Sequence, residues 1–385
     1  MDLDLTSEQE LLRDTVRGVC AKHTGLDVVR QMEDDAIGFP ETFWLQLAEL
    51  GLLGLTLPVA WGGSGMSMLD AVVVYQELGR ALAPSPHFVS SVISGGVLAR
   101  AGTDEQRRVW LPAIAAGDAI VTPAWLEPGG GFGPEGVQLR ASPDVGGWRL
   151  TGSKRHVPFA RSADRLLVLA RAEEGVVLLL VDPGADGVAL DQQRTIASDT
   201  QYRVDFDGVH VADDALVGTT SGGWPVWDAV MHDGIVLLAA QAVGGARHAL
   251  DITVQYAKDR RQFDKPLGAF QAIAHYLADA VTAVDGAETL VWEAAWARDA
   301  GRSHVRLAPM AKLFACKTFR DVTAMAQQVF GGVGFTVEYD IQLYFRRAKQ
   351  LQLSWWDDRY LEELIATDVL GPYSSPPGPS GPASG

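Results

Sequence analysis

The sequence is poor in cysteine and in basic residues, and each shortage argues against a class of protein. Cys20 and Cys316 are the two cysteines among 385 residues, and no cluster of cysteine, histidine and aspartate has the spacing of a zinc site. Lysine and arginine number 32 against 48 aspartates and glutamates, which gives a net charge of −16. Nucleic acid and anionic membranes both require a basic surface, so we expect neither as a partner, and we expect no metal.

The chain also lacks a signal segment and a long apolar run. It begins MDLDLTSEQE, which is acidic and contains no hydrophobic signal core. The longest apolar run, GIVLLAAQAVGGA, is interrupted by Gln241 and is shorter than a bilayer requires. These features predict a cytoplasmic protein without a membrane span, in which the thiols stay reduced.

Two common catalytic motifs, G-x-S-x-G and the P-loop, are missing as well. Gly131, Gly133 and Gly136 in GFGPEG match the spacing of a dinucleotide-binding fingerprint, which requires a strand before it and a helix after it. Pro134 lies inside this segment, and the VQLR that follows alternates as a strand does. We therefore predict a loop within a β region and no Rossmann site.

Hydrophobic periodicity divides the chain into three domains and a tail. Residues 1–118 have apolar residues at helical spacing, and 119–220 change to short β-rich runs, of which RLLVLAR and GVVLLLVDP predict a hairpin. Residues 221–370 return to helical spacing, while 371–385 are rich in Pro, Gly and Ser and are predicted to be disordered. Four long helices are predicted in the third domain, over 226–257, 270–299, 305–330 and 341–369. The fold class is therefore α with an inserted β domain, ending in an antiparallel four-helix bundle.

Two stretches of the third domain carry the most specific signal. In YAKDRRQFDKPLGAFQAIAH, Arg260 and Arg261 lie beside Phe263 just before a new helix, an arrangement that suits a phosphate or pyrophosphate. In QQVFGGVGFTVEYDIQLYFRRAK, Gly331 and Gly332 permit close approach of a flat ligand or of another backbone. Taken separately, the first also fits a solvated turn between helices, and the second fits a helix C-cap.

Taken together, these two stretches and the helix–β–helix layout resemble the acyl-CoA dehydrogenase family. The resemblance covers nearly the whole chain except the tail, and it depends on the motifs R-x-x-F and Q-x-F-G-G-x-G-[FY]-x-x-E-Y. It implies an N-terminal helical domain, a middle β domain and a C-terminal four-helix bundle, assembled as a tetramer. It also implies FAD, an acyl-CoA thioester substrate oxidised to its 2,3-enoyl form, and an electron-transfer flavoprotein or similar acceptor. In this reaction a carboxylate removes the α proton and the flavin takes the β hydride.

The resemblance also assigns residues to the cofactor. Arg260 and Phe263 match positions that contact the pyrophosphate and adenine side of FAD, and Gln328, Gly331 and Gly332 match positions that hold the same end. In the family these groups reach across a dimer interface to the FAD seated mainly in the neighbouring subunit. The chain thus retains the positions that a subunit contributes to its neighbour.

The positions that hold the flavin ring differ from the family pattern. The usual T-E-P-G-x-G-S-D reads LEPGGGFGP here, so Leu126 replaces a threonine. In GSKRHVPFA, His156 replaces a tryptophan and Pro158 replaces a hydroxyl residue, and proline also has no backbone N–H. Each change removes a hydrogen bond or a stacking surface for the flavin.

Neither base position of the family holds a carboxylate. Counting without gaps from GGVGF places the usual Y-E-G-T on SWWD, so Trp355 occupies the position of the glutamate. The alternative base lies 26 residues before the conserved arginine in a subset of the family, and that position is Gly234. Asp233 and Asp357 are the nearest carboxylates, but on a helix their side chains would be rotated by about 100–200°. We predict that both are solvated carboxylates at helix ends and that His232–Asp233 forms a polar turn before a helix.

The pattern predicts one subunit of a heteromeric acyl-CoA dehydrogenase, of the kind known from actinobacterial steroid side-chain degradation. A partner would supply the glutamate and the flavin-ring pocket. Two alternatives stay open: a self-sufficient homotetramer with a shifted base such as Asp233, acting on acyl-CoA or on an acyl carrier protein, and a non-enzymatic relative of the fold. The acyl group itself cannot be read from the spacing of residues.

Overall fold

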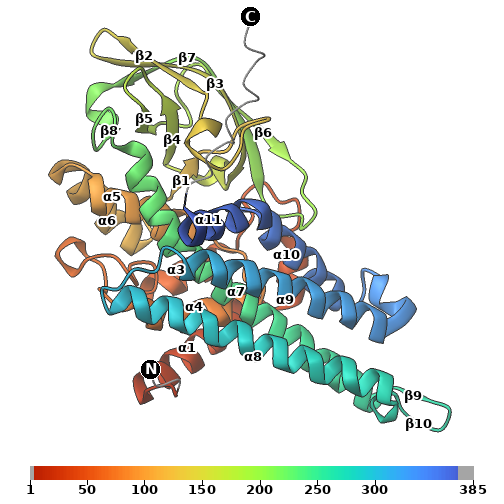
Figure 1. Ribbon diagram of the computed structural model, residues 1–385. Coiled ribbons are helices and arrows are strands. Elements are labelled where there is room, and N and C mark those ends of the chain that lie inside the picture. The colour runs from red at the N-terminus through yellow and green to blue at the C-terminus, as the bar shows by residue number, and fades with distance from the viewer. Residues whose placement is uncertain (1–3, 372–385) are drawn as a thin grey trace, which may run out of the picture.

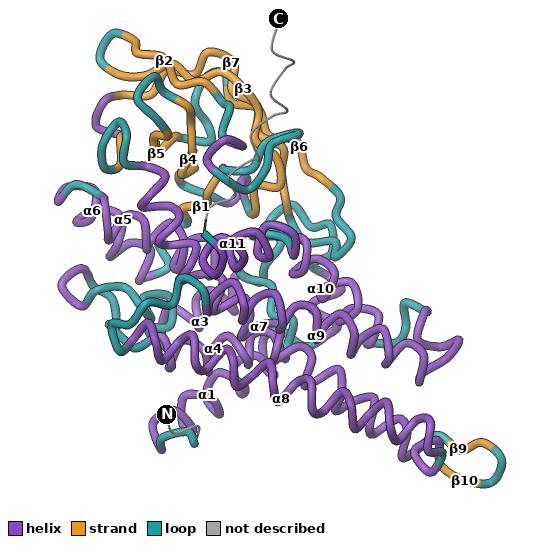
Figure 2. The backbone as a smooth tube through the Cα atoms, viewed as in Figure 1, coloured by secondary structure: helices purple, strands orange, loops and turns teal. Residues whose placement is uncertain are grey.

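The structure is a computed structural model that describes residues 4–371 of the chain (Figure 1). The predicted disorder of 371–385 therefore falls almost wholly outside the described residues. Within them, helices from both ends of the chain pack together, and the strands gather on one side of this helical body (Figure 2). The predicted arrangement of helical, β and helical segments is confirmed.

The N-terminal helices form one wall of the core. Ser67 and Asp70 make a capping box at the start of one of them, and Thr103 and Gln106 make another, which fixes where these helices begin. A π-helical segment, Phe88–Ser94, leads directly into the next helix. The helices are α1 Ser7–His23, α2 Leu26–Gln31, α3 Glu41–Glu49, α4 Met68–Arg80, α5 Gly95–Ala101 and α6 Asp104–Ala116.

The middle of the chain forms an eight-stranded, mostly antiparallel sheet with the order β6-β7-β3-β2-β4-β5-β8, while β1 pairs with β4 in parallel. The predicted hairpin is confirmed, since β4 and β5 pair antiparallel along six residues. The GFGPEG segment is a loop with a short 3₁₀ turn, as predicted. The strands are β1 Val121–Ala124, β2 Arg140–Asp144, β3 Gly147–Pro158, β4 Arg165–Arg171, β5 Val176–Val181, β6 Val188–Gln193, β7 Gln201–Ala212 and β8 Leu216–Val217.

The C-terminal helices pack lengthwise against one another and against α4. They are α7 Gly223–Asp259, α8 Gln271–Asp299, α9 Leu307–Phe330, α10 Ile341–Leu353 and α11 Asp358–Leu370, with a small hairpin of β9 Arg261–Gln262 and β10 Lys265–Pro266 between α7 and α8. The prediction of one helix over 341–369 is wrong, because α10 and α11 are separate. The apolar periodicity continues through both helices and conceals the break between them.

The longest helix, α7, is the centre of the helical core. The sequence analysis predicted an apolar run too short to span a membrane. The observed helix has 37 residues, and by length and composition it could cross a membrane, so that prediction is wrong. However, 89% of its apolar window is buried inside the protein. At Gly244 a Cβ atom would lie 1.9 Å from the carbonyl oxygen of Gln76, so only glycine allows α4 to pack this closely. Helix packing therefore accounts for the apolar composition of α7.

The break between α10 and α11 is a fixed turn with unusual backbone angles. Trp355 and Trp356 both have positive φ, 55° and 73°, which non-glycine residues rarely adopt. The fully buried Lys312 of α9 donates from Nζ to the carbonyl oxygens of Leu351 (3.1 Å) and Trp356 (2.9 Å). Asp357 then caps α11 by accepting from the backbone N–H of Tyr360. These bonds hold the two tryptophans in place.

Candidate active site

The Trp355–Trp356 turn lies where the sheet meets the helical core. The half-buried Trp355 ring stacks on Trp125, with centroids 5.8 Å apart and planes at 21°, and its other neighbour is the edge of Phe88 at 5.0 Å. Trp356 is fully buried against His232 at 5.0 Å. The position predicted from the motifs for the usual base thus holds an indole that packs against two other aromatic rings.

The second base position faces the same aromatic group. A Cβ atom built on Gly234 would lie 2.7 Å from Cδ1 of Ile93 and 3.4 Å from Cζ of Phe88. Any side chain at this position would require the terminal methyl group of Ile93 to shift. The sequence comparison therefore pairs two positions, 234 and 355, that the fold brings to the same ring of Phe88.

Asp233 belongs to a buried ion cluster, and its predicted place at a solvated helix end is wrong. It lies inside α7, 8% exposed, with carboxylate oxygens 2.5 Å from Arg100, 3.5 Å from Arg298 and 3.0 Å from Nε2 of His304. Burial opposes ionisation, but the adjacent His304 ring and the two arginine charges outweigh it, so the pKa of Asp233 lies below its ordinary value. His232 is also buried within α7 and does not form a turn before it.

Asp357 lies at a helix end, as predicted, but it is half-buried and serves as the cap of α11. Its Oδ1 accepts from the Tyr360 backbone at 3.0 Å. A carboxylate that caps a helix gives up this bond and the favourable interaction with the helix dipole when it takes a proton. Its position thus favours a structural role.

The three altered flavin-ring positions do come together. Leu126, His156 and Pro158 line one cavity of about 340 Å³ with Trp125 and Trp355. In the same wall the carbonyl oxygen of Pro158 accepts from the hydroxyl of Thr122 at 2.6 Å, and Nδ1 of His156 lies 2.8 Å from Oε1 of Gln201. The leucine and proline side chains offer this cavity no hydrogen bond, and the histidine is already bonded within the chain. These three side chains therefore offer a flavin ring fewer hydrogen bonds than the threonine and hydroxyl residue of the family pattern would.

A buried ion pair explains why other parts of the same two motifs are retained. Lys154 is 0% exposed and its Nζ lies 2.5 Å from Oε1 of Glu127, which also accepts from the backbone N–H groups of Gln138 and Leu139. Burial lowers the pKa of Lys154 to about 8, although Glu127 opposes this change. The sequence analysis passed over this pair; its signal was the glutamate of LEPG and the lysine of GSK. The pair anchors the loop that carries Trp125, because Lys154 also donates to the Trp125 carbonyl.

The five residues matched to the far end of FAD lie on exposed surface away from the sheet. The hairpin that follows α7 projects at the end of the bundle (Figure 1). The Tyr256 ring stacks on Phe330, 4.2 Å between centroids, and thereby joins the ends of α7 and α9. These two helix ends carry the exposed residues Arg260, Phe263, Gln328, Gly331 and Gly332. Among the described residues no carboxylate pairs with Arg260, so its guanidinium is available to a phosphate from another chain.

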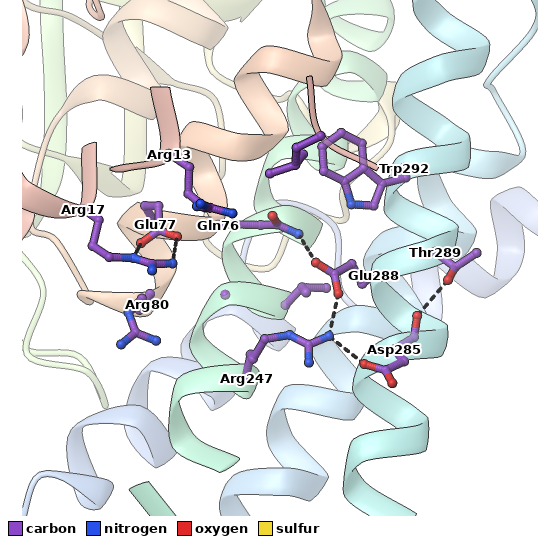
Figure 3. Close-up of a pocket in the computed structure, with 13 residues that line it drawn as sticks. Arg13, Arg17, Gln76, Glu77, Arg80, Arg247, Asp285, Glu288, Thr289 and Trp292 are labelled. Atoms are coloured by element: carbon purple, nitrogen blue, oxygen red, sulfur yellow. Dashed lines mark hydrogen bonds and ion pairs between the residues drawn. The ribbon is translucent and has the colours of Figure 1, made fainter. Parts of the chain in front are cut away.

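A separate charged cavity of about 370 Å³ lies between α1, α4, α7 and α8 (Figure 3). Arg17 forms two bonds with Glu77, and Arg247 bonds to both Asp285 and Glu288. The cavity shares no lining residue with the one beside Trp355. Its guanidinium and carboxylate groups largely neutralise one another, as expected for an ionic contact between helices.

The ion cluster around Asp233 predicts a stability effect. Asp233→Asn leaves Arg100, Arg298 and His304 without their anion, and the free energy of unfolding should fall by about 3 kcal/mol. Urea denaturation measures it, with the exposed Asp259→Asn on the same helix as control. An unchanged midpoint for Asp233→Asn would contradict the assignment of this carboxylate to a structural cluster.

The Lys154 pKa predicts a pH dependence. Since it is near 8 in the folded protein and 10.5 ordinarily, the unfolded chain binds more protons between these values, and the Lys154 contribution to stability rises with pH. From pH 7 to pH 9 the wild type should gain about 1 kcal/mol relative to Lys154→Met. Urea unfolding of both proteins across this range isolates Lys154 from other titrating groups. A constant difference between them would refute the lowered pKa.

Comparison with known proteins agrees with this geometry. Residues 6–118 match the model for the acyl-CoA dehydrogenase N-terminal domain, and residues 221–355 match that for the C-terminal domain. Benzylmalonyl-CoA dehydrogenase of Aromatoleum aromaticum is 31% identical over 96% of the chain and 100% of its own length.

Among the similar solved structures are two whose names each combine two protein names. The ChsE4–ChsE5 complex from Mycobacterium tuberculosis has a TM-score of 0.88 and 28% identity, over 97% of this chain and 100% of the matched chain. The Tcur3481–Tcur3483 steroid ACAD has a TM-score of 0.84 and 32% identity, over 94% and 98%. This chain belongs to the acyl-CoA dehydrogenase family, whose members bind FAD and dehydrogenate acyl-CoA thioesters.

Proposed function

We propose that this chain is one subunit of a heteromeric acyl-CoA dehydrogenase and that it completes the FAD site of an unlike partner. The partner supplies the glutamate that removes the α proton of the acyl thioester, and it holds the flavin ring that takes the β hydride. The observation that carries the proposal is the packing of Trp355, at the position of the base, between Trp125 and Phe88.

The chain's own residues do not support proton abstraction. An indole has no basic site for a proton, and the loss of a general base typically costs about 10²–10⁴ in rate. The self-sufficient alternative would require Asp233 to leave Arg100, Arg298 and His304 and to reach the far side of α7. That alternative is therefore the weaker one.

The exposed end of the bundle supports the other half of the proposal. Arg260 at the end of α7 and Gln328 near the end of α9 face solvent, and Gly331 and Gly332 leave the nearby backbone uncovered. An arginine without an internal partner is well suited to a pyrophosphate, because charge-assisted hydrogen bonds are roughly twice as strong as neutral ones. The paired names of the two similar solved structures agree with an assembly of unlike chains.

Flavin content tests the proposal directly. We expect the chain purified alone to carry little FAD and to reduce no dye with acyl-CoA substrates. Co-expressed with an acyl-CoA dehydrogenase-like chain that retains the glutamate and the T-E-P-G segment, it should co-purify with one FAD for each pair of unlike chains. A yellow, active preparation of this chain alone would overturn the proposal, and so would a failure to bind any such partner.

Arg260→Ala should weaken FAD binding by the heteromer about tenfold to a hundredfold, since one charge-assisted bond contributes about 1.5–3 kcal/mol. Arg261→Ala is the matched control, because that guanidinium already donates to the carbonyl oxygen of Asp264. Fluorescence titration of the apo-heteromer with FAD measures both affinities. Equal affinities for the two variants would contradict the role given to Arg260.

A further inference from the structure

A second, smaller cavity of about 120 Å³ adjoins the 340 Å³ cavity that Leu126, His156 and Pro158 line. An arginine without an ion pair lies in its wall. The two cavities share the residues Pro158, Gln201, Gln350 and Trp355. Apolar side chains from three segments line the smaller one, including Met32 after α2, Phe88 and Val89 before α5, and Leu238 of α7. Arg347 of α10 also lines it. The cavity therefore combines an apolar surface with one cationic group, Arg347, and two carboxylates, Glu33 and Asp199.

The side chain of Arg347 forms no direct ion pair and no hydrogen bond among the described residues. Its Nε is buried without a hydrogen bond, and among the residues 4–371 no carboxylate forms an ion pair with its guanidinium. Burial lowers the pKa of Arg347 from its ordinary value, although the charges of Asp199 and Glu33 act in the opposite direction. A half-buried guanidinium that has no direct ion pair and whose Nε lacks a hydrogen bond is costly, so such a group calls for an explanation.

The carboxylates in the same wall are already engaged. Glu33 forms an ion pair with the neighbouring Arg346, which also donates to Gln342 at 2.8 Å. Asp199 accepts hydrogen bonds from the side chains of Thr195, Gln201 and Gln350. The contrast between adjacent arginines is informative, because one is fully bonded while the other faces a cavity. The N–H groups of Arg347 are therefore free to bind a ligand in that cavity.

We propose that Arg347 and the apolar wall formed by Phe88, Val89 and Leu238 make a binding site for a small carboxylate. A planar guanidinium can bind a carboxylate through two parallel hydrogen bonds, and the apolar residues accommodate a short hydrocarbon part. A cavity of about 120 Å³ is several times the roughly 10–15 Å³ of probe volume that one water requires, so it has room for a short carboxylate such as propionate. The same chemistry could come from a free short-chain acid or from the distal carboxylate of a dicarboxylic acyl thioester. This site does not depend on the chain being a subunit of a heteromer.

Propionate binding to the isolated chain tests the proposal. Propionate should raise the melting temperature and change tryptophan fluorescence, since Trp355 lines the cavity, while propionamide and chloride at equal concentration should do neither. Arg347→Gln should weaken propionate binding at least tenfold. Arg359→Gln, which removes an exposed guanidinium from α11, should leave it unchanged.

The ligand-free variants separate binding from support of the fold. Because Arg347 is unpaired, Arg347→Gln should melt at or above the temperature of the wild type without propionate. A lower melting temperature, together with no response of the wild type to propionate, would show a structural role and overturn the proposal. Equal propionate binding by Arg347→Gln and the wild type would also overturn it.

Comparison of succinyl-CoA with butyryl-CoA in the same assay distinguishes the two sources. Tighter binding of succinyl-CoA that depends on Arg347 identifies an acyl-borne carboxylate. Binding of propionate alone identifies a free acid. These results are independent of flavin content, so a failure here is distinct from a failure of the heteromer proposal.

Discussion

The contact between the rings of Trp355 and Trp125 is the interaction on which the rest of the site depends, because it closes the position of the base against the sheet. Two left-handed residues in succession cost of order 1–3 kcal/mol each. The fully buried Trp356 opposes this cost, since a buried aromatic removes about 150–250 Å² from water, or roughly 4–6 kcal/mol at 25 cal/mol per Å². The hydrogen bonds from Lys312 then fix the turn. Under the proposed function, this aromatic plug stands where the family carries its catalytic carboxylate and the neighbouring glycine.

In the middle-domain motifs, some residues match the family pattern and others depart from it, and burial explains the difference. Glu127 and Lys154 hold the backbone of the loop from inside, so the loss of either leaves a buried charge unpaired. Leu126, His156 and Pro158 point at the cavity, where a change costs the fold little. The stability of the fold therefore requires Glu127 and Lys154 but tolerates substitution of the other three residues. Under the proposed function, this chain keeps the architecture of the family while the flavin ring is held by its partner.

Sequence periodicity was enough to predict the order of helices and strands, because apolar spacing records which faces are buried. It failed at the end of α10, where the apolar residues keep helical spacing while two residues adopt left-handed angles, a feature that no propensity of tryptophan predicts. Motif alignment selected Gly234 and Trp355, and the fold brings both positions to the same ring of Phe88. It could not reveal that Asp233 is paired with Arg100, Arg298 and His304, because these partners lie on segments far apart in the sequence. Nor could it reveal the cavity beside Arg347, because the residues that line this cavity also come from distant segments.

The location of the isoalloxazine in a crystal structure of the heteromer with FAD tests the central claim most directly. The account predicts that the ring lies beside the glutamate of the unlike subunit and that Arg260 contacts the pyrophosphate of the same molecule. Density for the ring in the cavity between Leu126, Pro158 and Trp355 of this chain would contradict it.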